Sequence, residues 1–204
     1  SYRQAIKIKP DYPEAHNNLG MVLCELGMLD EALACSHKAL SLLPNFAEAH
    51  FAIANTLVAL KEFDKAIDLY NKAIKLKPNL VDGYSNLGGA LMMLGRLEEA
   101  LDIQKKAIEI NPNYFQGYNN LGVTQMYLGE YDEAISNYRE AITLKSNYVD
   151  AGRNLLIVIL YVPGLSVEEL FAEHKRFSEN YTRDISSPEE GLRNDTSPNR
   201  PLRI

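Results

Sequence analysis

Residues 81–114 read VDGYSNLGGALMMLGRLEEALDIQKKAIEINPNY, and this stretch decides the fold. Apolar residues recur at helical spacing from 82 to 94, and Gly95 then supplies a residue type that ends helices. A second helical pattern runs from about 98 to 110 and stops at Pro112, because proline cannot continue a helix. The stretch is therefore predicted to form two helices joined by a short turn.

The pattern of this stretch recurs along the chain with a period of 34 residues. Nearly every unit carries leucine or isoleucine in its first helix, alanine twice in its second helix, and proline at its end. The leucine or isoleucine series is Leu19, Ile53, Leu87, Leu121 and Leu155, and the proline series is Pro10, Pro44, Pro78 and Pro112. One helix pair cannot bury its apolar face alone, whereas stacked pairs bury a continuous core. The sequence therefore predicts an all-α solenoid of stacked antiparallel helix pairs.

The repeated positions resemble the tetratricopeptide repeat. In the stretch quoted above, the residues that carry the resemblance are Tyr84, Leu87, Gly88, Leu91, Ala100, Ala107 and Pro112. The resemblance implies a right-handed superhelix and covers residues 1 to about 161. The implied units are the second helix of a truncated repeat (1–12), four full repeats (13–46, 47–80, 81–114 and 115–148), and a partial repeat with a capping or transition helix (149–184).

The period fails after Tyr161. A turn is predicted at 162–164, and Ser166-Val-Glu-Glu169 has the spacing of a capping box that opens a new helix. We interpret this helix as a cap on the last face of the solenoid. It is expected to direct one set of side chains to one side, namely Leu170, Phe171, His174, Phe177 and Tyr181. Residues 185–204 are rich in Ser, Pro, Asn, Asp and Glu and are predicted to be an irregular linker.

Residues 155–177, the linker, and the final Arg-Pro-Leu-Arg-Ile of the chain together resemble the junction in O-GlcNAc transferases and their SPINDLY-type relatives. In that family the repeats pass through a transition helix into a glycosyltransferase domain. The resemblance implies that the linker leads to a catalytic domain beyond this chain, and that this chain recruits protein substrates to a nucleotide-sugar-dependent transferase. The alternative is a free-standing scaffold or adaptor without an enzymatic domain, and the coding sequence beyond Ile204 distinguishes the two.

Composition argues against several other classes of function. The chain has 21 Lys and Arg against 27 Asp and Glu, which disfavours nucleic acid and anionic membranes as partners because both need a basic face. It contains no paired CxxC, no HExxH and no phosphate-binding glycine motif, so no catalytic residue, cofactor or metal is predicted. Cys24 and Cys35 are expected to be buried small hydrophobes in a reducing, cytoplasmic compartment.

Asparagine recurs at one position of the first helices. The series consists of Asn18, Asn86, Asn120 and Asn154, with Ala52 in the second repeat. Asparagine is less favourable in a helix than alanine by ~0.6 kcal/mol. O-GlcNAc transferases carry such a row along their concave groove, and the resemblance implies that these amides bind the backbone of an extended peptide, with Asn55 as a substitute for Ala52. Shared ancestry of the repeats, or hydrogen bonds between neighbouring helices, would also explain the series.

The charge of neighbouring groove positions narrows the choice of peptide. The second position of each repeat is acidic or neutral. The residues at this position are Glu14, Glu48, Asp82, Gln116 and Asp150. Arg153 is the only basic residue on the adjoining face. This pattern disfavours acidic tails and tolerates neutral or basic segments of protein substrates. Self-association of the chain through its convex face is a further alternative.

Overall fold

The computed structural model describes residues 1–163 and 166–182. Over these residues the chain forms only helices. They are α1 (Tyr2–Ile8), α2 (Pro13–Glu25), α3 (Leu29–Leu42), α4 (Ala47–Ala59), α5 (Phe63–Leu76), α6 (Val81–Met93), α7 (Leu97–Ile110), α8 (Phe115–Leu128), α9 (Tyr131–Leu144), α10 (Val149–Val158), the short 3₁₀ helix η1 (Ile159–Tyr161) and α11 (Val167–Thr182).

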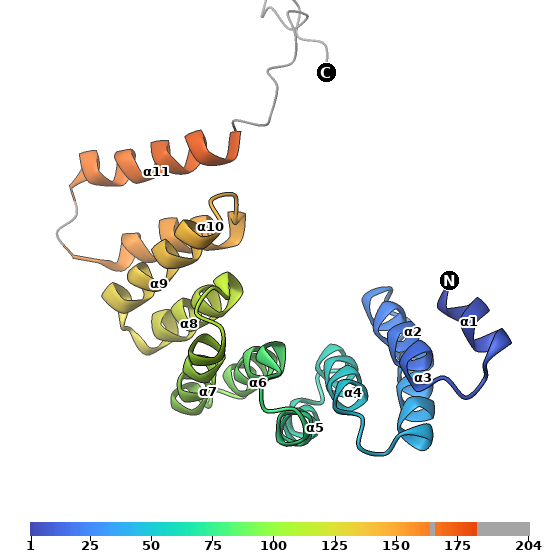
Figure 1. Cartoon of the computed structure of the whole chain (residues 1–204). Helices are drawn as coiled ribbons and strands as arrows, with labels where there is room; N and C mark the ends of the chain where they lie inside the picture. The colour runs from blue at the N-terminus through green and yellow to red at the C-terminus, as the bar shows by residue number, and fades with distance from the viewer. Residues whose placement is uncertain (164–165, 183–204) are drawn as a thin grey trace, which may run out of the picture.

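The helices pack as consecutive pairs that follow one another around an arc (Figure 1). The pairs are α2 with α3, α4 with α5, α6 with α7, and α8 with α9, and each second helix also contacts the first helix of the next pair. Helix α10 packs on α9 and begins a further pair. The all-α solenoid predicted from the 34-residue period is confirmed.

Small residues allow the two helices of a pair to approach closely. The alanines in the first turn of the second helices, Ala32, Ala66, Ala100 and Ala134, have no exposed surface. A Cβ atom added to Gly88 would lie 2.5 Å from Cγ of Gln104, and one added to Gly122 would lie 2.8 Å from the ring of Tyr138. Both distances are too short for packed carbon atoms. The glycine and alanine series therefore marks the places where paired helices cross.

The turn inside each pair needs one residue with a left-handed backbone. Gly27, Gly95 and Gly129 hold this position with φ between 74° and 81°, whereas the second repeat places Lys61 there with a φ of 62°. Glycine adopts this conformation freely, while other residues are strained by ~1–2 kcal/mol. The second repeat thus carries local strain that the other repeats lack.

Helix α11 begins as the capping box predicts. The backbone N–H of Ser166 donates to Oε2 of Glu169 over 2.8 Å, and the backbone N–H of Glu169 donates to Oγ of Ser166 over 3.2 Å. The helix contacts α10, and its Glu173 carboxylate pairs with Arg139 of α9 at 3.0 Å and with Arg176 at 3.3 Å. Helix α11 therefore packs against the last helices of the solenoid, as a cap does.

The buried side of α11 differs from the expected one. Leu170, Glu173 and Phe177 are half-buried, whereas His174 is exposed and Phe171 is 69% exposed. The prediction that Phe171 shares the side of Leu170 was wrong, because a residue next in sequence lies about 100° around the helix. His174 lies one turn after Leu170 but is exposed. The side chain of Tyr181, Gly164 of the predicted turn, and the predicted linker (185–204) lie outside the described residues.

Candidate peptide-binding groove

The first helices of successive pairs place the predicted asparagines beside polar side chains of the preceding repeat. Nδ2 of Asn86 donates to Oδ1 of Asn55 over 2.9 Å. Nδ2 of Asn120 donates to Oγ of Ser85 over 2.9 Å, and Nδ2 of Asn154 donates to Oδ1 of Asn119 over 3.0 Å. Each of these hydrogen bonds joins two repeats, so the asparagine row also connects the helices that carry it.

The acceptor position explains the role of Asn55. Ser85 and Asn119 each lie one residue before the asparagine of their own repeat, but the second repeat has the apolar Phe51 at that position. Asn86 therefore donates to Asn55, one helical turn further along α4. The hydroxyl of Tyr70 also donates to Oδ1 of Asn55, over 2.6 Å. Asn55 was predicted only as a substitute for Ala52, and it is the acceptor of two hydrogen bonds.

The first junction, between α2 and α4, lacks the corresponding hydrogen bond. Ala52 stands where the later repeats have a donating asparagine, and it is 2% exposed. Asn17, at the acceptor position of the first repeat, is 2% exposed, and its Oδ1 has no hydrogen-bond partner among the described residues. Asn18 itself is half-buried. The row of interhelical hydrogen bonds is therefore continuous from α4 to α10, and it is interrupted between α2 and α4.

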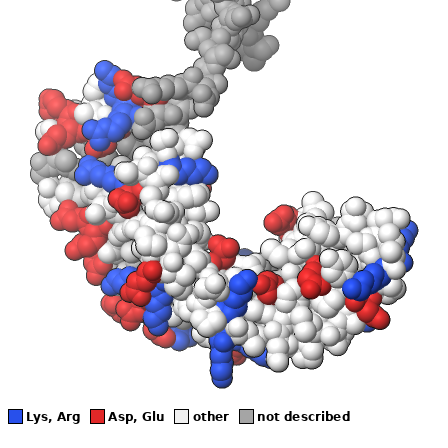
Figure 2. Space-filling view, in the orientation of Figure 1, with Lys and Arg blue, Asp and Glu red and all other residues white. Residues whose placement is uncertain are grey.

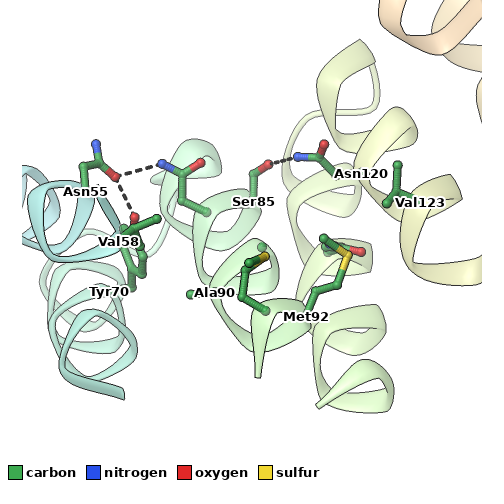
Figure 3. Close-up of a pocket in the computed structure, with 12 residues that line it drawn as sticks. Asn55, Val58, Tyr70, Ser85, Ala90, Met92, Asn120 and Val123 are labelled. Carbon is green, nitrogen blue, oxygen red and sulfur yellow. Dashed lines mark hydrogen bonds between the residues drawn. The ribbon is translucent and has the colours of Figure 1, made fainter. Parts of the chain in front are cut away.

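A pocket of about 470 Å³ opens on the row between α4, α6 and α8 (Figure 3). Asn55, Asn86 and Asn120 line it, so three of the five predicted site residues are brought together, while Asn18 and Asn154 lie outside it. The remaining lining residues, which sequence reasoning missed, are Val58, Tyr70, Ser85, Gly89, Ala90, Met92, Met93, Gln104 and Val123. A signal existed for Ser85, because polar residues recur at its position as Asn17 and Asn119.

The interhelical bonds leave part of each amide unused. A primary amide has one acceptor oxygen and two N–H donors. In the described part of the chain, Oδ1 of Asn86 and Oδ1 of Asn154 accept no hydrogen bond, and the NH₂ group of Asn55 donates none. All three side chains are half-buried and so reach the surface of the groove. The row thus offers both donors and acceptors to a ligand.

Most of the acidic positions that were predicted to line the groove are paired. Burial raises the pKa of Glu48, but the hydrogen bond and the positive charge of Lys77, whose Nζ lies 2.6 Å away, outweigh it and hold the pKa below its usual value. Asp82 accepts a hydrogen bond from the Tyr114 hydroxyl over 2.9 Å. Arg153, which was predicted on the adjoining face, pairs with Asp150. On the face shown in Figure 2, the inner curve of the arc is largely uncharged, with a few acidic and basic side chains.

The other residues considered in the sequence have packing roles. Nε2 of His16 lies 2.8 Å from the carbonyl oxygen of Pro10, and the hydroxyl of Tyr84, at the equivalent position, donates to the carbonyl oxygen of Pro78 over 3.2 Å. Cys24 and Cys35 are free and half-buried, so the expectation that they are buried was wrong.

Within 1–163 and 166–182, no group of three His, Cys, Asp or Glu side chains could hold a metal ion. Within the same ranges, every helix is too short or too polar to cross a bilayer.

Comparisons with known proteins agree with this architecture. A family model described as "TPR repeat" matches residues 1–27 and 54–95, and one described as "Tetratricopeptide repeat" matches residues 80–147. A search of curated proteins found no match. Solved structures with a similar fold include TTC0263, a thermophilic TPR protein of Thermus thermophilus (25% identity, 85% of this chain and 94% of that chain, TM-score 0.70).

Two further similar structures show the fold alone. YrrB, described as a TPR protein with an unusual peptide-binding site, is 23% identical over 91% of this chain and 94% of that chain, with a TM-score of 0.64. PilF of Pseudomonas aeruginosa is 21% identical over 83% of this chain and 75% of that chain, with a TM-score of 0.73. The two family models together match more than half of the residues. The chain belongs to the tetratricopeptide repeat family.

Proposed function

We propose that this chain binds extended peptide segments of partner proteins along the asparagine row of its inner face. The observation that carries the proposal is the pocket shared by Asn55, Asn86 and Asn120, in which the NH₂ group of Asn55 and Oδ1 of Asn86 have no partner among the described residues. An extended peptide backbone presents alternating N–H and C=O groups, which a row of amides can match without reading the peptide's side chains.

The interhelical hydrogen bonds support this proposal. Nδ2 of Asn86 and of Asn120 is already held by the neighbouring helix, at 2.9 Å in each case. A side chain held in place loses less conformational entropy when it binds a ligand than a free one does. The two explanations of the asparagine series are therefore compatible, because one N–H can connect the helices while the rest of the amide contacts a peptide.

The charges of the groove define the class of peptide. The acidic positions Asp82 and Glu48 each have a hydrogen-bond partner, and the basic Arg153 is paired with Asp150. The positions Glu14, Glu48, Asp82, Gln116 and Asp150 hold no basic residue, so a neutral or basic peptide fits better than an acidic tail. The peptide-binding site named for YrrB supports peptide binding as a function of this fold.

The test is a double variant, Asn86→Ala with Asn120→Ala. Each lost contact contributes ~0.5–1.5 kcal/mol, so affinity for a bound peptide should fall roughly fivefold to 150-fold. The variant also loses two interhelical bonds, so its melting temperature should fall. The matched control is Asn137→Ala, which removes the 2.6 Å hydrogen bond to Gln125 between α9 and α8 but leaves the asparagine row and every pocket-lining residue unchanged. The control should lower the melting temperature without changing peptide affinity, and an equal loss of affinity in both proteins would contradict the proposal.

We further propose that the peptides are segments of protein substrates, and that the chain recruits them to a nucleotide-sugar-dependent, O-linked N-acetylglucosamine-type glycosyltransferase. The support is the order of elements at the C-terminal side, where η1 ends the fifth repeat and the Ser166 capping box opens α11. Cys24 and Cys35 are both free, which supports a reducing, cytoplasmic compartment. A scaffold without an enzymatic domain remains the alternative function. Reading the coding sequence beyond Ile204 tests the choice, because a glycosyltransferase domain there supports the transferase and its absence supports the scaffold.

A further inference from the structure

The pocket on the asparagine row has a polar level and an apolar level. In Figure 3, Asn55, Ser85 and Asn120 lie in one row, and Val58, Ala90 and Met92 lie on one side of it. The apolar residues follow the polar ones along α4 and α6, toward the C-terminal ends of these helices. A peptide backbone held by the amides would therefore place one of its side chains over the apolar level.

The composition of the pocket selects an uncharged side chain. None of its lining residues is Asp, Glu, Lys or Arg. A charged side chain that entered it would lose water without gaining an opposite charge, which is strongly unfavourable. The volume of about 470 Å³ lies within the range of small-ligand pockets (~300–1,000 Å³), so a large side chain can be accommodated.

Two features favour an aromatic ring with a polar tip. Met92 and Met93 line the apolar level, and thioether sulfur atoms make favourable contacts with aromatic rings. Gln104, also a lining residue, is 1% exposed. Its Oε1 accepts a hydrogen bond from Thr124 over 2.8 Å, but its Nε2 is buried without a partner among the described residues. A buried donor without an acceptor is costly, and a ligand oxygen would remove that cost.

We propose that this apolar level is a specificity subsite for one tyrosine side chain of the bound peptide. The proposal rests on the proposed function, because the amides must hold the peptide backbone. The ring packs against Met92 and Met93, and the hydroxyl oxygen accepts a hydrogen bond from Nε2 of Gln104. The groove then recognises the backbone through its asparagines and sequence through this subsite.

The experiment uses four degenerate peptide libraries and the whole 204-residue chain. Each library holds fluorescein-labelled peptides of about 11 residues with Tyr, Phe, Ala or Glu fixed at the centre, and with an equal mixture of Ser, Thr, Ala, Gly and Lys elsewhere. Fluorescence anisotropy measures affinity. Burial of the ring should make the Tyr library bind about 10- to 100-fold more tightly than the Ala library. The Phe library should lie between them, and the Glu library should bind no better than the Ala library.

Two variants locate the effect. Met93→Ala should reduce the ratio of Tyr to Ala affinity at least threefold, and Met93 is 60% exposed, so folding should tolerate the change. The control, Leu94→Ala, changes the next residue, which is also exposed but does not line the pocket, and it should leave the ratio unchanged.

The outcomes separate the two proposals. If no library binds, peptide binding itself is contradicted. If all libraries bind equally, or if Met93→Ala leaves the Tyr preference unchanged, the subsite is contradicted and the backbone role of the asparagines stands. Tighter binding of Phe than of Tyr contradicts the hydrogen bond from Gln104 and with it the choice of tyrosine. The double variant Asn86→Ala with Asn120→Ala should weaken all libraries by similar factors.

Discussion

Two junctions between successive repeats differ in how their first helices contact each other. The first junction lies between α2 and α4, and the second lies between α8 and α10. At the second, the Asn154 amide donates to Asn119 across the two helices over 3.0 Å. At the first, Ala52 provides no donor, and Oδ1 of Asn17 stays buried without a partner among the described residues. Helices α2 and α4 also contact each other more extensively than α8 and α10 do, as expected where a small alanine replaces a bridging amide. One fold thus tolerates both an apolar junction and a hydrogen-bonded one.

The difference extends over the neighbouring residues of the second repeat. Its first helix carries His50 and Phe51, both nearly buried, where the third repeat has Tyr84 and Ser85. The ring of Phe51 packs against Tyr70 with 5.8 Å between centroids. This repeat gives up one interhelical bond and gains apolar contacts. The asparagine row is therefore a property of particular junctions and does not follow from the repeat period alone.

The largest difference is expected when the acceptor is removed at each junction. Asn119→Ala deletes the partner of Asn154, so the free energy of unfolding should fall by about 1–2 kcal/mol. Asn17→Ala deletes an unpaired buried oxygen and introduces a better helix former, so stability should stay within about 0.5 kcal/mol or rise. Urea unfolding followed by circular dichroism measures both. Equal losses would mean that the Asn154–Asn119 bond contributes nothing.

A new donor at the junction between α2 and α4 should give it the interhelical hydrogen bond that the junction between α8 and α10 has. In Ala52→Asn, the introduced amide can donate to Oδ1 of Asn17, so the effects of Ala52→Asn and Asn17→Ala on stability should not add. The expected coupling free energy is about 0.5–1.5 kcal/mol in a double-mutant cycle. A coupling near zero would show that the closer approach of α2 and α4 leaves no room for the bridge.

The buried histidine of the second repeat should make stability depend on pH. Burial, followed by the charge of Lys72, lowers the pKa of His50 below its ordinary value. The unfolded chain therefore takes up a proton at a higher pH than the folded chain does. Stability from this group is complete above the unfolded pKa and declines as the pH falls below it.

His50→Tyr, which introduces the residue of the third and fourth repeats, should reduce this loss. The melting temperature between about pH 7.5 and pH 5.5 should fall less in the variant than in the original chain. Carboxylates with lowered pKa values, such as Glu48, are present in both proteins, so their contribution cancels in the comparison. Parallel curves for the two proteins would contradict the role of His50.

The smallest effect is expected at the turn of the second repeat. Lys61→Gly relieves a left-handed backbone that Gly95 adopts without strain in the third repeat. Part of the gain is lost to the greater entropy of glycine in the unfolded chain, so the net gain should be about 0.5 kcal/mol. Gly95→Lys, the reverse exchange, should lower stability by a similar or larger amount. Thermal unfolding measures both, and a loss of stability in Lys61→Gly would contradict the strain at this turn.

Much of the fold could be predicted from the sequence because its signals are local. The spacing of apolar residues predicts each helix. Gly95 marks the C-terminal end of α6, and Pro112 marks that of α7, each within a few residues. The capping box at Ser166 involves residues only three apart. The packed side of α11 was predicted less well, because residues such as Phe171 can be assigned to a side only once the helix contacts α9 and α10.

The candidate site was predicted in position but not in its contacts. The sequence alone determined that Asn86, Asn120 and Asn154 share one face of their helices, since residues 34 apart in such a repeat occupy equivalent places. Their hydrogen bonds join residues 31 to 35 apart on different helices, and the depth and register of helix packing set such distances. Only the tertiary structure therefore decided that Asn55 replaces the acceptor lost at Phe51, that Oδ1 of Asn17 has no partner among the described residues, and that a neutral pocket opens beside the row.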